Sequence, residues 1–172
     1  MVKARALSWT SPPPQQLGNR ILFPEKKVES DEMFNKLLIP YDGSMASELS
    51  FAMGLELAEK YHSIIHLMII GRLPEPTLGI ESKAYLEAIR GYYKGRLAAM
   101  TRRAEAKSLK VHVDIRAGHP AEQIVRSAQE EEVDLIIMGK CGSGKSTVHG
   151  WPLGTVTERV VTYAQCAVLV VA

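Results

Sequence analysis

The chain of 172 residues has only two cysteines, no long hydrophobic run and no large excess of charge of either sign. Two cysteines do not make the disulfide framework of a small secreted domain, so a reduced, cytoplasmic location is expected. The longest apolar stretch, residues 64–70, includes a histidine, whereas a membrane-spanning helix needs about 20 apolar residues. The first residues lack the apolar segment of a secretory signal. We therefore expect no membrane partner.

The near-neutral charge also argues against a nucleic-acid partner. Lys and Arg number 21 against 19 Asp and Glu, and residues 1–30 hold five of the basic and two of the acidic groups. The surplus of +3 in this segment leaves a net charge of −1 for the remainder, too little for binding by bulk electrostatics. The five histidines show no spacing typical of metal ligands, and no Ser–His–Asp order stands out. No catalytic residue is predicted, and any metal ligand stays unknown.

The sequence divides once, near residue 32. Residues 1–32 show neither helical nor strand periodicity and contain three consecutive prolines. We interpret them as a flexible N-terminal extension in which one short apolar patch, residues 21–23, is a candidate for docking. Residues 33–172 alternate short apolar runs with helical patterns, which is typical of one folded domain.

The alternation predicts an α/β fold. Strands are expected at residues 36–40, 64–70, 111–116, 133–138 and 168–171, and helices at 44–61, 81–108, 119–132 and 155–164. Three of the strands are continuous apolar runs, which indicates strands that are covered on both faces. Strands joined through helices make right-handed crossovers, so the sheet is expected to be mostly parallel.

Two segments place unusual residues at carboxyl ends of predicted strands, where open parallel sheets bind ligands. Residues 40–44 read Pro-Tyr-Asp-Gly-Ser, and residues 138–147 contain three glycines with Lys140 and Lys145. Glycines allow the backbone to surround an anion, and the dipole of a following helix adds to the attraction. A tight turn alone would need fewer glycines and no lysines. This pattern favours a phosphate-binding loop.

Residues 139–146 also match the Walker A pattern G-x-x-x-x-G-K-[ST] of P-loop NTPases. That motif requires a long helix directly after its Ser or Thr, but Pro152 follows within six residues of Ser146. No apolar strand that ends in a magnesium-binding Asp follows either. A P-loop NTPase is therefore the least favoured of the alternatives.

Five motifs in order make residues 33–172 resemble the universal stress protein family. They are KLLIPYDGS at 36–44, GHPAE at 118–122, DLIIMG at 134–139, LGTVTERV at 153–160 and CAVLVV at 166–171. The resemblance implies a Rossmann-like three-layer sandwich with a five-stranded parallel sheet of order 3-2-1-4-5. ATP-binding members carry G-x2-G-x9-G-[ST] after the fourth strand. Here Gly139, Gly142, Gly154 and Thr155 fit that pattern with two residues added to the loop.

The resemblance also implies a set of nucleotide-binding residues. Asp42, with Pro40 and Tyr41, would lie at the adenosine end, Ile69 and Met138 would pack on adenine, and Gly139 would lie by the ribose. The phosphates would meet Gly142, Gly144, Gly154, Thr155 and Val156. Ser143, Lys145 and Ser146 lie in the extended loop, and the expectation that Lys145 reaches phosphate comes from its charge alone.

The function expected from the resemblance is that of a universal stress protein that binds ATP, together with Mg²⁺, and acts as a stress-response sensor or regulator. Hydrolysis would be slow or absent. The apolar last strand would be a sheet edge, which is prone to association unless paired, and in this family it pairs with a second copy. A homodimer with unidentified regulatory partners is therefore expected. A dimeric scaffold of the same family that binds no nucleotide stays open as the alternative.

Overall fold

The computed structural model describes residues 33–72, 81–142 and 153–172. In these ranges strands and helices alternate along the chain. The strands are β1 (Lys36–Pro40), β2 (Ile64–Gly71), β3 (Val111–Ala117), β4 (Leu135–Gly139) and β5 (Ala167–Val171). The helices are α1 (Met45–Tyr61), α2 (Glu81–Glu105), α3 (Pro120–Glu130) and α4 (Thr155–Tyr163). The predicted N-terminal extension and the residues Ser143, Gly144, Lys145 and Ser146 lie outside the described residues.

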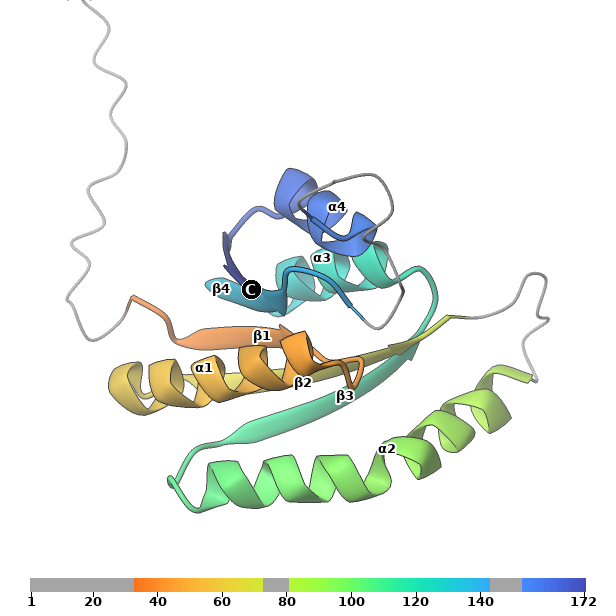
Figure 1. The fold of residues 1–172 in the computed structure, drawn as a ribbon, viewed down its shortest axis with the longest axis horizontal. Helices are drawn as coiled ribbons and strands as arrows, with labels where there is room; N and C mark the ends of the chain where they lie inside the picture. The colour runs from red at the N-terminus through yellow and green to blue at the C-terminus, as the bar shows by residue number, and fades with distance from the viewer. Residues whose placement is uncertain (1–32, 73–80, 143–152) are drawn as a thin grey trace, which may run out of the picture.

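The five strands form one parallel sheet of order β3-β2-β1-β4-β5. Helices α1 and α2 cover one face, and α3 and α4 cover the other (Figure 1). This confirms the predicted α/β, Rossmann-like architecture and strand order. The order reverses at β1, from which the chain first builds toward β3 and then crosses to β4. Strands β1 and β4 are thus neighbours whose carboxyl ends diverge into separate loops, the place where open α/β sheets bind ligands.

Two apolar cores fill the space between the sheet and its helices. The first lies under α1 and α2 and includes Phe51, Leu37 and Met100. The second lies under α3 and α4 and includes Leu38, Ile124 and Val160. Successive residues of a strand point to opposite faces, so the continuous apolar run of β1 supplies both cores. None of the described helices has the length and apolarity needed to cross a bilayer.

Among the predicted boundaries that differ from the structure by a few residues, two have a clear local reason. The helix expected to reach residue 108 ends at Glu105, because Ser108 takes a left-handed φ of 57° and the N–H of Leu109 turns back to the carbonyl of Ala104. The strand expected from residue 133 begins at Leu135. The N–H of Val133 instead closes the end of α3 by donating to the carbonyl of Ala128 at 2.9 Å.

Candidate functional site

A cavity of about 530 Å³ opens at the carboxyl ends of β1, β2 and β4. Loops, α1 and the first turns of α3 and α4 complete its walls. The lining residues are Pro40, Tyr41, Asp42, Ser44, Ser47, Met68, Ile70, Arg72, Tyr93, Pro120, Ile124, Met138, Gly139, Cys141, Gly142, Gly154, Thr155, Val156 and Thr157. The volume falls within the range of about 300–1,000 Å³ typical of small-molecule sites.

The structure brings together most of the residues that the sequence predicts for the site. Those that line the cavity are Pro40, Tyr41, Asp42, Met138, Gly139, Gly142, Gly154, Thr155 and Val156. They come from three segments that are far apart in the chain and meet only in the folded protein. The binding role of each residue stays a prediction, but their common location is a structural fact.

Ile69 is the predicted site residue that the structure places elsewhere. It is buried in the core under α1 and α2, on the opposite face of the sheet from α3. Its neighbours Met68 and Ile70 line the cavity instead. Side chains alternate between faces along a strand, so the apolar wall that β2 gives to the cavity consists of Met68 and Ile70.

The loop after β1 holds Asp42 in place through both its side chain and its backbone. Oδ1 of Asp42 accepts a hydrogen bond of 3.0 Å from the N–H of Ser44, and the carbonyl of Asp42 accepts one of 3.0 Å from the hydroxyl of Tyr93. Gly43 adopts a φ of 79°, a conformation that favours glycine, and a Cβ there would lie 2.3 Å from a nitrogen of Arg96. The carboxylate is therefore presented at the cavity wall by a rigid turn.

Two tyrosines back this loop from the side of α1 and α2. Tyr41 is buried, and its hydroxyl donates to a carboxylate oxygen of Glu48. Burial raises the pKa of Tyr41, and the hydrogen bond to Glu48 raises it further. Burial likewise raises the pKa of Tyr93, with a smaller effect from the charge of Asp42. Both phenols thus stay neutral at physiological pH and act as hydrogen-bond donors.

The glycines after β4 allow close approach of three segments. A Cβ at Gly139 would lie 2.5 Å from Cβ of Ala46, so β4 meets the start of α1 only because this side chain is absent. A Cβ at Gly142 would lie 2.6 Å from Oδ2 of Asp42. The hydroxyl of Thr157 donates to the carbonyl of Gly139 at 2.9 Å. These contacts bring the loop after β4 against the loop after β1 and fix it to α4.

Helix α4 points its N-terminus at the cavity. Gly154 occupies the N-cap with φ −68° and ψ 150°, and its N–H donates to the carbonyl of Lys140 at 2.9 Å. The first N–H groups of a helix have no partner within the helix, and they carry the positive end of its dipole. The cavity-lining residues Thr155, Val156 and Thr157 form this turn. Such an arrangement suits an anion such as phosphate.

Several cavity residues were missed by sequence reasoning. Arg72 directly follows β2, and it gives the wall a positive charge that its position after a predicted strand could have revealed. Tyr93 reaches the cavity from α2, 51 positions from Asp42 in the sequence, and no local pattern indicates this contact. Pro120 and Ile124 face the cavity because α3 begins beside β2. The other additions are Ser44, Ser47, Met68, Ile70, Cys141 and Thr157.

The described part of the chain holds no group of three or more His, Cys, Asp and Glu side chains that is placed to bind a metal ion. Asp42 is the carboxylate among the residues that line the cavity. Mg²⁺ typically binds through one or two carboxylates and the phosphates of a substrate. Among the described residues of the cavity, Asp42 is thus the carboxylate that could contribute to such a site.

The comparisons with known proteins agree with the fold and with the family motifs. The family model described as "Universal stress protein family" matches residues 33–172. A universal stress protein of Methanocaldococcus jannaschii is 30% identical over 145 residues, which cover 82% of this chain and 84% of that protein. The structure solved for another protein of that organism superposes with a TM-score of 0.66 at 28% identity, and the match covers 81% of this chain and 96% of that chain.

A universal stress protein solved in complex with cAMP shares the fold, with a TM-score of 0.65 at 19% identity over 81% of this chain and 98% of its own. The family model spans most of the chain and ends with β5, so it includes every element of the sheet and every described wall of the cavity. This chain belongs to the universal stress protein family.

Proposed function

We propose that this protein binds ATP, with Mg²⁺ on its phosphates, in the cavity at the carboxyl end of the sheet. One observation carries the proposal: three separate chain segments bring an apolar wall, a fixed carboxylate and a helix N-terminus to one cavity of nucleotide size. A protein of the same fold holds cAMP, so the architecture has room for an adenine nucleotide.

The walls of the cavity suggest how the nucleotide lies. Met68, Ile70 and Met138 provide a surface of the kind that stacks against a purine. Gly139, whose carbonyl accepts a hydrogen bond from Thr157 of α4, would lie by the ribose. The N–H groups of the first turn of α4 and the loop at Gly142 would meet the phosphates. Lys145 and Ser146 lie outside the described residues, and their contact with phosphate stays part of the proposal.

We propose a sensor or regulator rather than an efficient hydrolase. Fast phosphoryl transfer needs a group that orients the attacking water and further charges that stabilise the transition state. Among the described cavity residues, Asp42 and Arg72 carry formal charges, and the turn of Ser44 fixes Asp42. Slow hydrolysis at such a site would let occupancy report the nucleotide level. A cytoplasmic location agrees with this role.

Thermal unfolding with and without Mg-ATP tests the proposal. A ligand at 100 times its dissociation constant stabilises a protein by about 2.7 kcal/mol. For a domain of this size that corresponds to about 5–10 °C in melting temperature. Adenosine and tripolyphosphate serve as separate controls for the two ends of the site, and each should produce a smaller shift. Absence of any shift at millimolar Mg-ATP, in protein stripped of nucleotide, would contradict the proposal.

We propose further that residues 33–172 are the folded domain and that two copies pair through β5. This strand is a sheet edge hydrogen-bonded to β4, and its sequence AVLVV carries no charge to deter pairing. Light scattering should give the mass of a dimer, and Val170→Lys should give a monomer. A wild-type monomer at micromolar concentration would refute the pairing.

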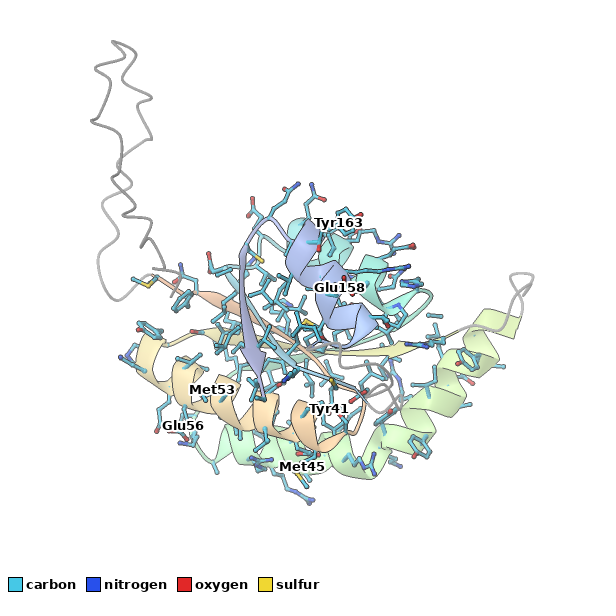
Figure 2. The ribbon with its side chains drawn as sticks, turned by 45° about the horizontal axis from the view of Figure 1, so that its top comes forward. Tyr41, Met45, Met53, Glu56, Glu158 and Tyr163 are labelled. Atoms are coloured by element: carbon cyan, nitrogen blue, oxygen red, sulfur yellow. The ribbon has the colours of Figure 1, made fainter. Side chains whose placement is uncertain are left out.

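One surface favours the alternative of a scaffold for partner proteins. Met45, Leu49 and Met53 recur every fourth residue along α1, with exposed fractions of 77%, 44% and 43%. Figure 2 labels Met45 and Met53 on this helix. Such a stripe on a helix is typical of contact surfaces. A scaffold without nucleotide would keep its partners in the variant Gly154→Asp, which is designed below to remove phosphate binding. Loss of partners in that variant would link the two functions.

A further inference from the structure

A second hollow lies far from the nucleotide cavity, at the opposite end of α3. It is a groove of about 170 Å³ between the last turns of α3 and the segment that joins α4 to β5. The lining residues are Val125, Ala128, Gln129, Glu132, Val133, Gln165 and Cys166. Its volume resembles that of an apolar cavity of about 150 Å³ that binds benzene. The groove therefore has room for one phenyl ring or a branched aliphatic side chain.

The groove has an apolar floor and an acidic rim. Val125, Ala128, Val133 and Cys166 form the floor, and Ala128 and Val133 are almost fully buried. Among the lining residues Glu132 alone carries a formal charge. Burial raises the pKa of the Cys166 thiol, and the nearby carboxylate of Asp134 adds to this rise. The groove thus suits an apolar side chain with basic neighbours.

Residues 20–27 have the matching pattern. Ile21, Leu22 and Phe23 are flanked by Arg20 on one side and by the pair Lys26-Lys27 on the other. With Glu25 included, the segment carries a net charge of +2. It lies in the predicted N-terminal extension, which carries the surplus of positive charge found in residues 1–30.

The tether between this segment and the domain begins close to the groove in the fold. The chain joins the domain at Met33, and Lys36 is hydrogen-bonded to Asp134, which follows the groove residue Val133. The N–H of Lys36 donates to Oδ2 of Asp134 at 2.9 Å, and the carbonyl of Lys36 accepts from the N–H of Asp134 at 3.0 Å. From Phe23 to Met33 is ten residues, which reach at most about 35 Å and span about 17 Å on average when flexible.

We propose that Ile21, Leu22 and Phe23 dock in the groove between α3 and β5 of the same chain. The ring of Phe23 would fill the groove against its apolar floor, with Ile21 and Leu22 beside it, and the flanking basic residues would face Glu132 on the rim. A tether of this length supplies a local concentration in the millimolar range, so even a weak site is occupied. Helices α3 and α4 lie side by side (Figure 1). Docking would therefore contact the end of α3 and the segment that follows α4, and the first turns of these two helices line the nucleotide cavity.

The single cysteine of the groove provides the test. In the full-length chain with Cys141→Ser, Cys166 is the remaining thiol of the two, and its alkylation by N-ethylmaleimide is followed by mass spectrometry. Docking covers Cys166, so Phe23→Ser should raise the rate by about two- to tenfold, the ratio set by occupancy at the tether's concentration. Leu17→Ser makes a similar change outside the segment and should leave the rate unaltered.

A second pair of variants tests the charge contact. Glu132→Lys should raise the rate, and adding Lys26→Glu with Lys27→Glu should restore protection. In the Phe23→Ser chain, Glu132→Lys can change the alkylation rate only through its direct effect on the thiol of Cys166. The rate increase that Glu132→Lys causes in the parent chain beyond this direct effect measures the loss of docking. Equal rates for the parent and Phe23→Ser would overturn the proposal. Protection that grows with protein concentration would also overturn it, because the occupant would then be a second copy.

Discussion

Replacing the N-cap of α4 separates nucleotide binding from folding. Gly154 has φ −68° and ψ 150°, which any residue adopts, and a Cβ there meets nothing closer than 3.4 Å. Asp and Asn are both favoured N-caps, and each should change the free energy of unfolding by only a few tenths of a kcal/mol relative to Gly. Gly154→Asp and Gly154→Asn are therefore matched in shape and in folding, and they differ in one negative charge.

That charge would lie where we place the phosphates. Two like charges about 4 Å apart repel by about 1 kcal/mol in water and about 4 kcal/mol near a protein surface. A loss of about 1.4 kcal/mol is tenfold in affinity, so Gly154→Asp should weaken Mg-ATP binding by about fivefold to several hundredfold relative to Gly154→Asn. Adenosine carries no phosphate, and its affinity should be the same in both variants.

Isothermal titration of both variants with Mg-ATP and with adenosine measures these four affinities, and melting temperatures confirm that both variants fold. Equal ATP affinity in the two variants would refute the location of the phosphates at α4. Equal loss of ATP and adenosine would show that the change deforms the cavity, which would contradict the clearance seen around Gly154.

Three further predictions follow from packing, burial and the sheet edge. Gly139→Ala places a Cβ 2.5 Å from that of Ala46 and should lower the free energy of unfolding by about 1–3 kcal/mol. A Cβ at Gly95 in α2 meets nothing within 4 Å, so Gly95→Ala should raise the free energy of unfolding by up to about 1 kcal/mol. Urea unfolding measures both changes, and equal effects would contradict the close approach of β4 to α1. Burial lowers the pKa of His66, whose ring stacks on His112 at 5.3 Å. Because the fold favours the neutral form, the free energy of unfolding should be unaffected by this group above the unfolded pKa of about 6.5 and should fall as the pH drops below it. His66→Asn should reduce the dependence of the free energy of unfolding on pH between pH 7 and pH 5. An unchanged dependence would assign it to other groups. Val170→Lys should convert a dimer to a monomer with an unchanged circular dichroism spectrum, and retention of the dimer would move the interface away from β5.

The fold could be predicted because its signals are local. Continuous apolar runs mark strands buried on both faces, and the run of β1 supplies Leu37 to one core and Leu38 to the other. The cap at Ser44, whose side chain accepts from the N–H of Ser47, is equally readable from the residue type. Boundaries were harder, since nothing in the sequence shows that Val133 closes a helix rather than opening a strand.

The sequence predicts those cavity-lining residues that are glycines or that directly follow a strand. It does not predict the residues whose place at the cavity depends on which face of the sheet a side chain points to. A continuous apolar strand does not reveal which residues face which layer, so Ile69 was expected at a cavity that Met68 and Ile70 line. Tyr93 was missed because its contact with Asp42 spans 51 positions of sequence. Such contacts are set by tertiary packing and leave no local pattern.

Titration of nucleotide-free, full-length protein with Mg-ATP tests the central claim most directly. The cavity predicts saturable binding of one nucleotide per chain with a dissociation constant below about 1 mM, and competition by adenosine. Absence of saturable binding up to several times that concentration, in protein that melts cooperatively, would contradict the claim that this cavity is a nucleotide site.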